Sequence, residues 1–449
     1  MRNRLLILLS LLVISAMVLA ACGGAATPAA PAEEATVAEA TEAPAEEAPA
    51  EEEAPAEATE APAEEAGSDA AAATDGPTLT IWTDSNRAPV LEEIGAAFAE
   101  ENGVTLDIVQ KGFGDLRGDF IVAAPTGEGP DILLGAHDWI GELNASGLLS
   151  PIDLGDNADN FAENAVAAFT YPDGNLYGMP LAVENIALIY NTDMVPEAPA
   201  TFDEVATISQ ELKDGGAKYG FLRMAGDPYH FYPIQTAFGG YIFGKNDDGS
   251  YNAEDLGLNN EGSVASLEWY NSLFEDGLLD VGANIDHDLM TSAFQNGEAA
   301  MFIGGPWTLA GIREAGVPYA IANIPSGTEP GRPFLGVQGL MINSFSENQL
   351  LAQAFLQNVI ATDESMQAFY DTDPRLPAWK PTADSIEDPD LQAFLAAGAN
   401  ADPMPNIPEM NAVWGGWGDA ITLIANGTAT PQEAADQAQE QVSSAIAGE

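Results

Sequence analysis

The stretch of residues 79–109, LTIWTDSNRAPVLEEIGAAFAEENGVTLDIV, decides the fold class of this chain. Residues 79–82 form a short, largely apolar run, which is typical of a buried strand. Residues 90–101 carry apolar side chains at helical spacing, and Gly103 ends that helix before a second apolar run at 104–109. A strand, a helix and a second strand in this order predict a parallel sheet with right-handed crossovers, and therefore an α/β protein.

The α/β pattern continues through the rest of the globular sequence, which starts at Pro77. Because about 370 residues exceed the usual size of one domain, we expect two lobes. A turn at 129–130 leads into a third strand at 131–134, and the chain becomes mostly helical after residue 260. Further strands are expected at 300–303 and 339–342, and helices at 263–274, 349–359, 365–370, 389–397 and 431–447.

The first 22 residues have the pattern of a lipoprotein signal. Arg2 and Arg4 precede an apolar run at 5–19, which is too short for a comfortable membrane span and typical of a signal-peptide core. Small residues then lead to Cys22, as in the lipobox of bacterial lipoproteins; an ordinary cleaved signal beside an incidental cysteine is the alternative. Cys22 is the only cysteine, so the sequence excludes an intrachain disulfide and a multi-thiolate metal site.

Residues 22–76 differ in composition from the globular part. They repeat Ala, Pro, Glu and Thr without Lys, Arg or an aromatic residue, so we expect a disordered acidic tether. Thirteen glutamates lie between Glu33 and Glu65, yet the net charge of the chain is −57. The globular part is therefore strongly acidic too, which argues against nucleic acid or an anionic membrane surface as a partner.

Several motifs of the globular part occur in an order that resembles one known family. Each motif alone is weak, but together they span nearly all of residues 78–445. The chain resembles the maltose- and maltodextrin-binding proteins, the solute-binding subunits of carbohydrate ABC importers. The motifs are Gly129-Pro130-Asp131-Ile132, Ala136-His137-Asp138, Ser146-Gly147-Leu148-Leu149, Pro180-Leu181-Ala182-Val183-Glu184, Leu188-Ile189-Tyr190-Asn191, Pro228-Tyr229, Gly239-Gly240-Tyr241, Ala293-Phe294, Asn296-Gly297-Glu298, Gly304-Gly305-Pro306-Trp307 and Met404-Pro405-Asn406-Ile407-Pro408-Glu409-Met410.

The resemblance implies a two-lobed periplasmic-binding-protein fold of type II, the Venus-flytrap fold, with hinge strands between the lobes and the ligand in the cleft. It places the N-terminal lobe at 77–182 plus 326–384, and the C-terminal lobe at 183–325 plus 385–449. With the signal peptide at 1–21 and the tether at 22–76, this accounts for the whole chain.

Three aromatic residues match the sugar-stacking positions of the family: Trp307, Trp414 and Tyr229. A sugar offers C–H groups on its ring faces and hydroxyls at its rim, so a sugar site needs flat aromatic surfaces beside polar groups. The alternative for any tryptophan is a place in the core. Trp307 follows a Gly-Gly-Pro turn and Trp414 is followed by two glycines, which favours the cleft rim for both.

Three carboxylates and one cation match the polar positions of the family. Asp138, Glu184 and Asp227 are the expected acceptors of sugar hydroxyls, and Asp227 stands where the family commonly has Glu. Arg87 follows the first strand, where the family has a basic residue near the sugar. The alternative for each is a solvated surface charge. Because these groups divide between the lobes, we expect the sugar to bridge them and favour a closed state.

This chain also departs from the family pattern. A stacking Trp of the family falls on Gly135, and an Arg falls on Trp139, which we interpret as an aromatic side chain that has moved from position 135 to position 139 and reshaped the same subsite. A family Tyr falls on His287 and a neighbouring aromatic residue on His230. Met404, His287 and Trp139 are included among the expected ligand residues. These departures leave a saccharide as the expected ligand and put maltose itself in question.

The expected function is therefore that of a lipid-anchored receptor that binds maltose- or maltodextrin-type oligosaccharides and delivers them to ABC transporter permease subunits. We expect a monomer on the extracytoplasmic side of the membrane, without nucleic acid, metal or cofactor. A different oligosaccharide is one alternative, and a surface adhesin or sensor is another. A glycoside hydrolase with cleft carboxylates is a third, but no sequence motif marks a catalytic group, so we expect no enzyme.

Overall fold

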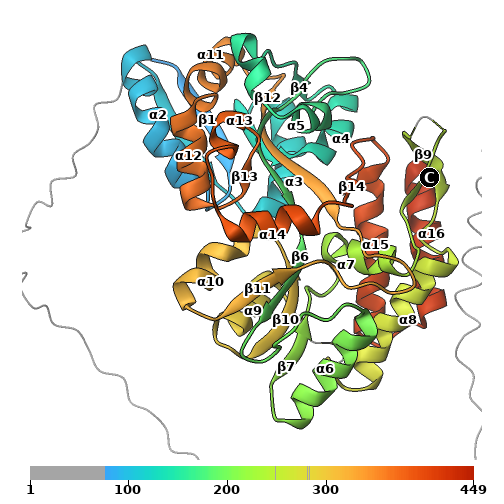
Figure 1. The fold of residues 1–449 in the computed structure, drawn as a ribbon. Coiled ribbons are helices and arrows are strands. Elements are labelled where there is room, and N and C mark those ends of the chain that lie inside the picture. The colour runs from blue at the N-terminus through green and yellow to red at the C-terminus, as the bar shows by residue number, and fades with distance from the viewer. Residues whose placement is uncertain (1–75, 248, 281, 283, 449) are drawn as a thin grey trace, which may run out of the picture. The chain divides into compact units, whose positions relative to one another are not determined.

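The computed structural model describes residues 76–247, 249–280, 282 and 284–448. The predicted signal peptide, Cys22 and all of the predicted tether but its last residue lie outside the described residues. Within the described part the chain forms two main sheets and a separate hairpin, which are covered by helices (Figure 1).

The larger sheet has the strand order β13-β5-β12-β3-β1-β2, and β4 and β14 also pair with β12. Strands β1 and β2 are parallel, with Thr78 opposite Thr105, and β3 is parallel to β1. This confirms the strand-helix-strand prediction at the start of the fold. The strands are β1 (Thr78–Thr83), β2 (Thr105–Gln110), β3 (Ile132–Ala136), β4 (Leu149–Ser150), β5 (Met179–Asn185), β12 (Phe334–Asn343), β13 (Leu376–Pro377) and β14 (Asp402–Pro403).

Helices from both ends of the globular chain cover this sheet. Helix α2 packs on β2, α3 on β1 and β3, and α11 on β12. The helices and short helical turns of this part are α2 (Ala88–Asn102), α3 (Phe113–Ala123), η1 (Ala124–Thr126), η2 (His137–Trp139), α4 (Ile140–Ala145), η3 (Gly155–Asn160), α5 (Glu163–Ala168), α11 (Gln349–Phe355), the π-helical turn η5 (Leu356–Ile360), α12 (Asp363–Thr372) and α13 (Lys380–Ala383).

The smaller sheet has the order β11-β6-β10-β7, and β8 and β9 form the hairpin. Helix α9 packs on β10 and α6 on β7, while α15 and α16 lie side by side (Figure 1). The elements are β6 (Ala187–Asn191), α6 (Phe202–Asp214), β7 (Tyr219–Leu222), α7 (Pro228–Ala237), β8 (Phe243–Lys245), β9 (Tyr251–Leu256), α8 (Glu261–Glu275), α9 (His287–Gln295), β10 (Ala299–Gly304), η4 (Pro306–Thr308), α10 (Leu309–Ala315), β11 (Tyr319–Ala322), α14 (Pro389–Ala397), α15 (Met410–Ala425) and α16 (Pro431–Ala447).

The chain crosses directly between the two sheets at two places. Only Ile186 separates β5 of the larger sheet from β6 of the smaller one, and the segment after β11 leads into β12. Helix α14 contacts both β11 and β5, so it lies against both sheets (Figure 1). The fold is thus the two-lobed α/β arrangement with connecting strands that the sequence predicted.

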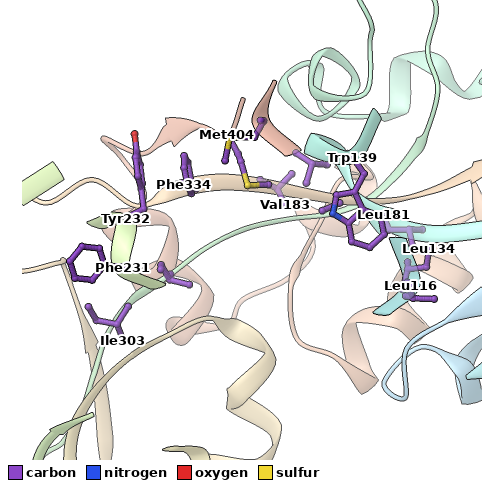
Figure 2. Packing of buried hydrophobic residues seen from close by; sticks show 14 of the residues in the cluster. Leu116, Leu134, Trp139, Leu181, Val183, Phe231, Tyr232, Ile303, Phe334 and Met404 are labelled. Atoms are coloured by element: carbon purple, nitrogen blue, oxygen red, sulfur yellow. The ribbon is translucent and has the colours of Figure 1, made fainter. Parts of the chain in front are cut away.

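Buried apolar side chains continue from one sheet to the other. Tyr232 of α7 and Phe334 of β12 stack with their ring centroids 3.6 Å apart and their planes 3° apart. Figure 2 shows both rings in parallel, with Met404 close to Phe334 and Trp139 farther toward the larger sheet in the same group of buried side chains. Burying a large apolar side chain contributes roughly 1.5–3 kcal/mol, so this contact holds the start of β12 firmly against α7.

Candidate functional site

Three half-buried aromatic residues are linked by ring contacts through Tyr229 and Phe334. Trp307 belongs to η4, Tyr229 to the first turn of α7, and Trp414 to α15. The ring centroids of Tyr229 and Trp307 are 6.3 Å apart, and Phe334 lies 6.1 Å from Tyr229 and 6.3 Å from Trp414. We call Trp307, Tyr229 and Trp414 the aromatic row. The structure therefore brings together the three rings that the sequence singled out for sugar stacking.

Gly305 permits the position of Trp307. A Cβ atom at residue 305 would lie 2.1 Å from the Trp307 ring, which is closer than any side chain could tolerate. The turn after β10 thus needs a glycine so that the indole can fold back over the backbone.

Asp138 lies beside the aromatic row but comes from η2, next to the larger sheet. Its side chain is buried, with the residue 6% exposed, and within the described part of the chain its Oδ1 atom has no hydrogen-bond partner. Burial raises the pKa of Asp138 to about 7, against the opposing charge of Arg117 and a hydrogen bond from the Trp414 side chain. A buried acceptor without a donor is costly, and a ligand hydroxyl would satisfy it.

Trp139, the neighbour of Asp138, occupies the space above Gly135. A Cβ atom at residue 135 would lie 2.4 Å from the Trp139 ring, and Trp139 packs against Phe113 with a centroid distance of 5.1 Å. This geometry agrees with the idea that an aromatic side chain moved from position 135 to 139. Trp139 is buried, and its contact with a ligand stays a prediction.

Glu184, at the end of β5, belongs to a buried network of charges. Its carboxylate forms an ion pair with Arg375 and accepts a hydrogen bond of 3.1 Å from Gln338 Nε2. Arg375 Nε also lies 2.8 Å from Asp373 Oδ2, and its guanidinium carbon lies 5.2 Å from the Trp307 ring centroid. Arg375 thus links the carboxylates beside the larger sheet to one ring of the aromatic row.

Tyr229 completes this corner of the site. Its hydroxyl is buried and has no hydrogen-bond partner within the described residues. Burial raises the pKa of Tyr229 well above its usual value, and the nearby charge of Glu184 raises it further. The hydroxyl therefore stays protonated and keeps both a donor and an acceptor for a ligand.

Arg87 is engaged within the protein. It is buried, forms an ion pair with Asp84 and lies 3.3 Å from Asp373. Since Asp373 also contacts Arg375, Arg87 belongs to the same charge network as Glu184. Direct contact between Arg87 and a ligand stays a prediction.

Asp227 is the N-cap of α7. Its carboxylate accepts backbone hydrogen bonds from Tyr229 at 3.1 Å and His230 at 3.3 Å, and it also bonds the imidazole Nδ1 of His230. Burial alone would raise the pKa of Asp227, but the charge and hydrogen bond of His230 hold that pKa below its usual value. The predicted ligand contact of Asp227 is untested, but its oxygens already have protein partners.

Met404 and His287 occupy different surroundings. The Met404 side chain is buried, and its carbonyl oxygen lies 3.1 Å from His137 Nε2. His287 is the first residue of α9 and is half-buried. Burial lowers the pKa of His287, and the nearby His230 lowers it further, so these two histidines lie close enough to interact. The role of each in ligand contact stays a prediction.

The chain is similar in sequence to a known family of bacterial proteins. Residues 93–396 match the model of the bacterial extracellular solute-binding proteins. The chain is 34% identical over 386 residues to a galactooligosaccharide-binding protein of Bacillus subtilis (strain 168). The aligned residues cover 83% of this chain and 90% of that protein. This chain belongs to the bacterial extracellular solute-binding protein family.

Two further relatives of this solute-binding protein carry informative names. A maltodextrin-binding protein of the same Bacillus strain is 33% identical over 382 residues, covering 82% of this chain and 90% of the relative. A maltotriose-binding protein of Pyrococcus abyssi (strain GE5 / Orsay) is 32% identical over 322 residues, covering 69% of each chain. The family consists of binding proteins, so the chain is not an enzyme.

Sequence reasoning missed several polar residues of the site. Asp373 and Arg375 lie in a short segment between α12 and β13 that carries no recognisable motif, and Gln338 lies inside a buried strand. The one available signal was a polar residue in an otherwise apolar strand, which points to a buried partner.

Neither a metal-ligand cluster nor a membrane-spanning helix occurs among the residues that the structure describes. No group of three or more metal-ligating side chains is arranged to hold a metal ion in that part of this solute-binding protein. Among the same residues, each helix is too short or too polar to span a bilayer.

Proposed function

We propose that this solute-binding protein captures a neutral oligosaccharide of the maltodextrin type for delivery to the permease subunits of a carbohydrate ABC transporter. One observation carries the proposal: two buried polar atoms without partners in the described residues occur at the aromatic row, Asp138 Oδ1 next to Trp414 and the Oη atom of Tyr229 within the row itself. A sugar ring supplies both things that this arrangement lacks, apolar faces for the rings and hydroxyls for the unpaired atoms.

The expected free energies of these contacts are large enough for micromolar binding of a sugar. A hydroxyl bonded to a charged acceptor contributes roughly 1.5–3 kcal/mol, and stacked rings add to this. After the cost of immobilising the sugar, a net binding free energy of about −8 kcal/mol corresponds to micromolar affinity.

A galactooligosaccharide is the second candidate. The relative that is 34% identical is named for binding that class, while others are named for maltodextrin and maltotriose. The Trp139 ring fills the space above Gly135, where the resembled family has a stacking Trp, and this difference next to Asp138 supports a ligand other than maltose itself.

Isothermal calorimetry with maltotriose, β-1,4-galactotriose and cellotriose tests the proposal. We expect one-to-one binding of maltotriose with a micromolar Kd and weaker binding of the other two. Tight binding of galactotriose alone would select the second candidate, and no heat with any of the three would overturn oligosaccharide capture. Arginine and phosphate serve as charged solutes that should not bind.

We further propose that the saccharide bridges residues beside both sheets and favours a compact closed state. The positions of Asp138 next to the larger sheet and Trp307 next to the smaller one support this. Small-angle X-ray scattering should show a smaller radius of gyration with saturating maltotriose. An unchanged radius of gyration in the presence of bound sugar would argue against closure.

The proposed anchor is a lipid on Cys22, which lies outside the described residues. It would hold a monomer at the extracytoplasmic face of the membrane, within reach of the permease. Replacing Cys22 with Ser should move the mature protein from the membrane fraction to the medium or periplasm. Retention of the C22S protein in membranes would contradict lipidation at this position.

A further inference from the structure

The Asp227 carboxylate is occupied by its own helix. Its two oxygens accept the backbone N–H groups of Tyr229 and His230, and one of them also bonds His230 Nδ1. Arg223 lies next to it and donates from Nη2 to the Asp227 carbonyl oxygen at 2.6 Å. These contacts leave Asp227 poorly placed to accept a further hydroxyl, although its position in the sequence suggested that role.

His230 stands between Asp227 and the aromatic row. Its residue is 6% exposed, and within the described residues its Nε2 atom has no hydrogen-bond partner. The imidazole centroid lies 6.0 Å from the Trp307 ring, nearly perpendicular to it at 87°, and 5.4 Å from the Tyr229 ring at 78°. The unpaired nitrogen therefore belongs to a ring that contacts two members of the aromatic row.

The contact with Asp227 fixes the chemistry of that nitrogen. An ionised carboxylate only accepts hydrogen bonds, so His230 Nδ1 must carry the proton and donate it. In the neutral imidazole this leaves a lone pair on Nε2, and in the imidazolium it leaves an N–H group. A sugar hydroxyl both donates and accepts, so it pairs with either form, whereas an aliphatic or deoxygenated group pairs with neither.

We infer that His230 is a specificity-determining residue whose Nε2 bonds one hydroxyl of the saccharide next to Trp307, with Asp227 as the positioning residue behind it. The inference rests on the proposed oligosaccharide function and deepens it. The Asp227–His230 pair takes over a contact that a carboxylate alone was expected to make. The buried nitrogen then selects against sugars that lack that hydroxyl, because it would remain unpaired.

Two variants of His230 distinguish the hydrogen bond made by Nε2 from the packing of the imidazole ring. His230→Phe keeps a flat ring and leaves the N-cap bonds of Asp227 available, while His230→Gln restores a polar group at the end of the side chain. With maltotriose we expect H230F to bind about tenfold more weakly than the wild type. H230Q should recover at least threefold of that loss. Tyr241→Phe removes a surface hydroxyl that bonds Asp255 and should bind like the wild type.

Monodeoxy analogues of maltotriose supply a readout that a structural role would not change. One analogue, which lacks the hydroxyl that His230 bonds, should bind the wild type about tenfold more weakly than maltotriose binds the wild type. On H230F, the same analogue and maltotriose should bind with equal affinity. Equal penalties for every analogue on both proteins, or an H230F affinity within twofold of the wild type, would overturn the role of His230. If the wild type binds none of maltotriose, galactotriose and cellotriose, the proposed function itself fails, and the inference fails with it.

Discussion

Asp138 and Asp227 are two carboxylates at the edge of one aromatic row, and they behave in opposite ways. Burial with few donors raises the pKa of Asp138 to about 7, while the pKa of Asp227 lies below its usual value despite burial, because His230 and two backbone N–H groups bond it. Residue type and sequence position suggested the same role for both. The difference teaches that a carboxylate with a free acceptor atom is available to a ligand, whereas a carboxylate whose oxygens already bond protein donors has a structural role.

The largest expected effect concerns the stability that Asp227 provides. Asp227→Ala removes the cap of α7 and leaves His230 buried without its partner, so the free energy of unfolding should fall by about 2–4 kcal/mol. Urea denaturation measures this. Asp286→Ala is the matched control, because Asp286 caps α9 through one backbone bond of 2.8 Å to Leu289. It should cost about 0.5–1 kcal/mol. Equal losses in the two variants would remove the distinction.

The next effect concerns the two ends of the aromatic row. Trp414→Ala and Trp307→Ala should each weaken maltotriose binding by about 1–3 kcal/mol through lost stacking area. Calorimetry of both variants checks this, with Phe345→Ala as a control, since Phe345 is exposed and lies outside the row. A neutral result for either tryptophan would exclude that ring from the site.

A smaller effect is the pH dependence that Asp138 introduces. Its pKa is raised from 3.8 to about 7 in the folded protein, so the folded state binds a proton that the unfolded state has released. The resulting stability is present below about pH 4 and is lost as the pH rises through about 7. At pH 8, Asp138→Asn should therefore have a free energy of unfolding about 1–2 kcal/mol higher than that of the wild type. The same variant should bind maltotriose more weakly than the wild type does.

Unfolding of both proteins between pH 5 and pH 8 measures this effect. The wild type should lose stability relative to D138N across that window. Parallel stability curves would show that Asp138 is ionised throughout this range. They would contradict the raised pKa of Asp138, on which its contrast with Asp227 depends.

The smallest effect is on the titration of Asp138 itself. Arg117 lowers the pKa of Asp138, so Arg117→Gln should shift that pKa upward. Carbon-13 NMR of the labelled carboxyl group follows the titration directly. Lys111→Gln is the control, because Lys111 pairs with Asp119 on the surface. A downward shift in R117Q would show that Arg117 acts in some other way than by its charge.

Much of the fold was predictable from local pattern. The first parallel strands are as expected, and the helices at 389–397 and 431–447 have the predicted bounds, because each begins with a cap residue followed by proline. The helix expected at 349–359 is α11 followed by the π-helical turn η5, a change of winding that no spacing of apolar residues signals.

The sequence singled out candidate site residues, whose contact with a ligand stays a prediction, but it did not indicate their protein partners. The resemblance singled out Trp307, Trp414 and Tyr229, and the structure links these three rings through Tyr229 and Phe334, because motif positions carry over with the fold. It could not foresee that His230 would occupy the Asp227 carboxylate. Each pairing joins a residue that matches the family pattern to one that does not: Asp227 to His230, and Glu184 to Arg375.

The single residue between β5 and β6 has a mechanical consequence. Ile186 is fully buried, and the side-chain amide of Asn185 donates both to its carbonyl oxygen at 3.2 Å and to that of Phe394 at 3.0 Å. At this crossing, one of the two direct ones, a rotation between the sheets must be taken up by a few backbone torsions, so the connection is short and stiff. One inserted residue would add up to about 3.5 Å of chain and would loosen this connection without replacing any residue of the candidate site.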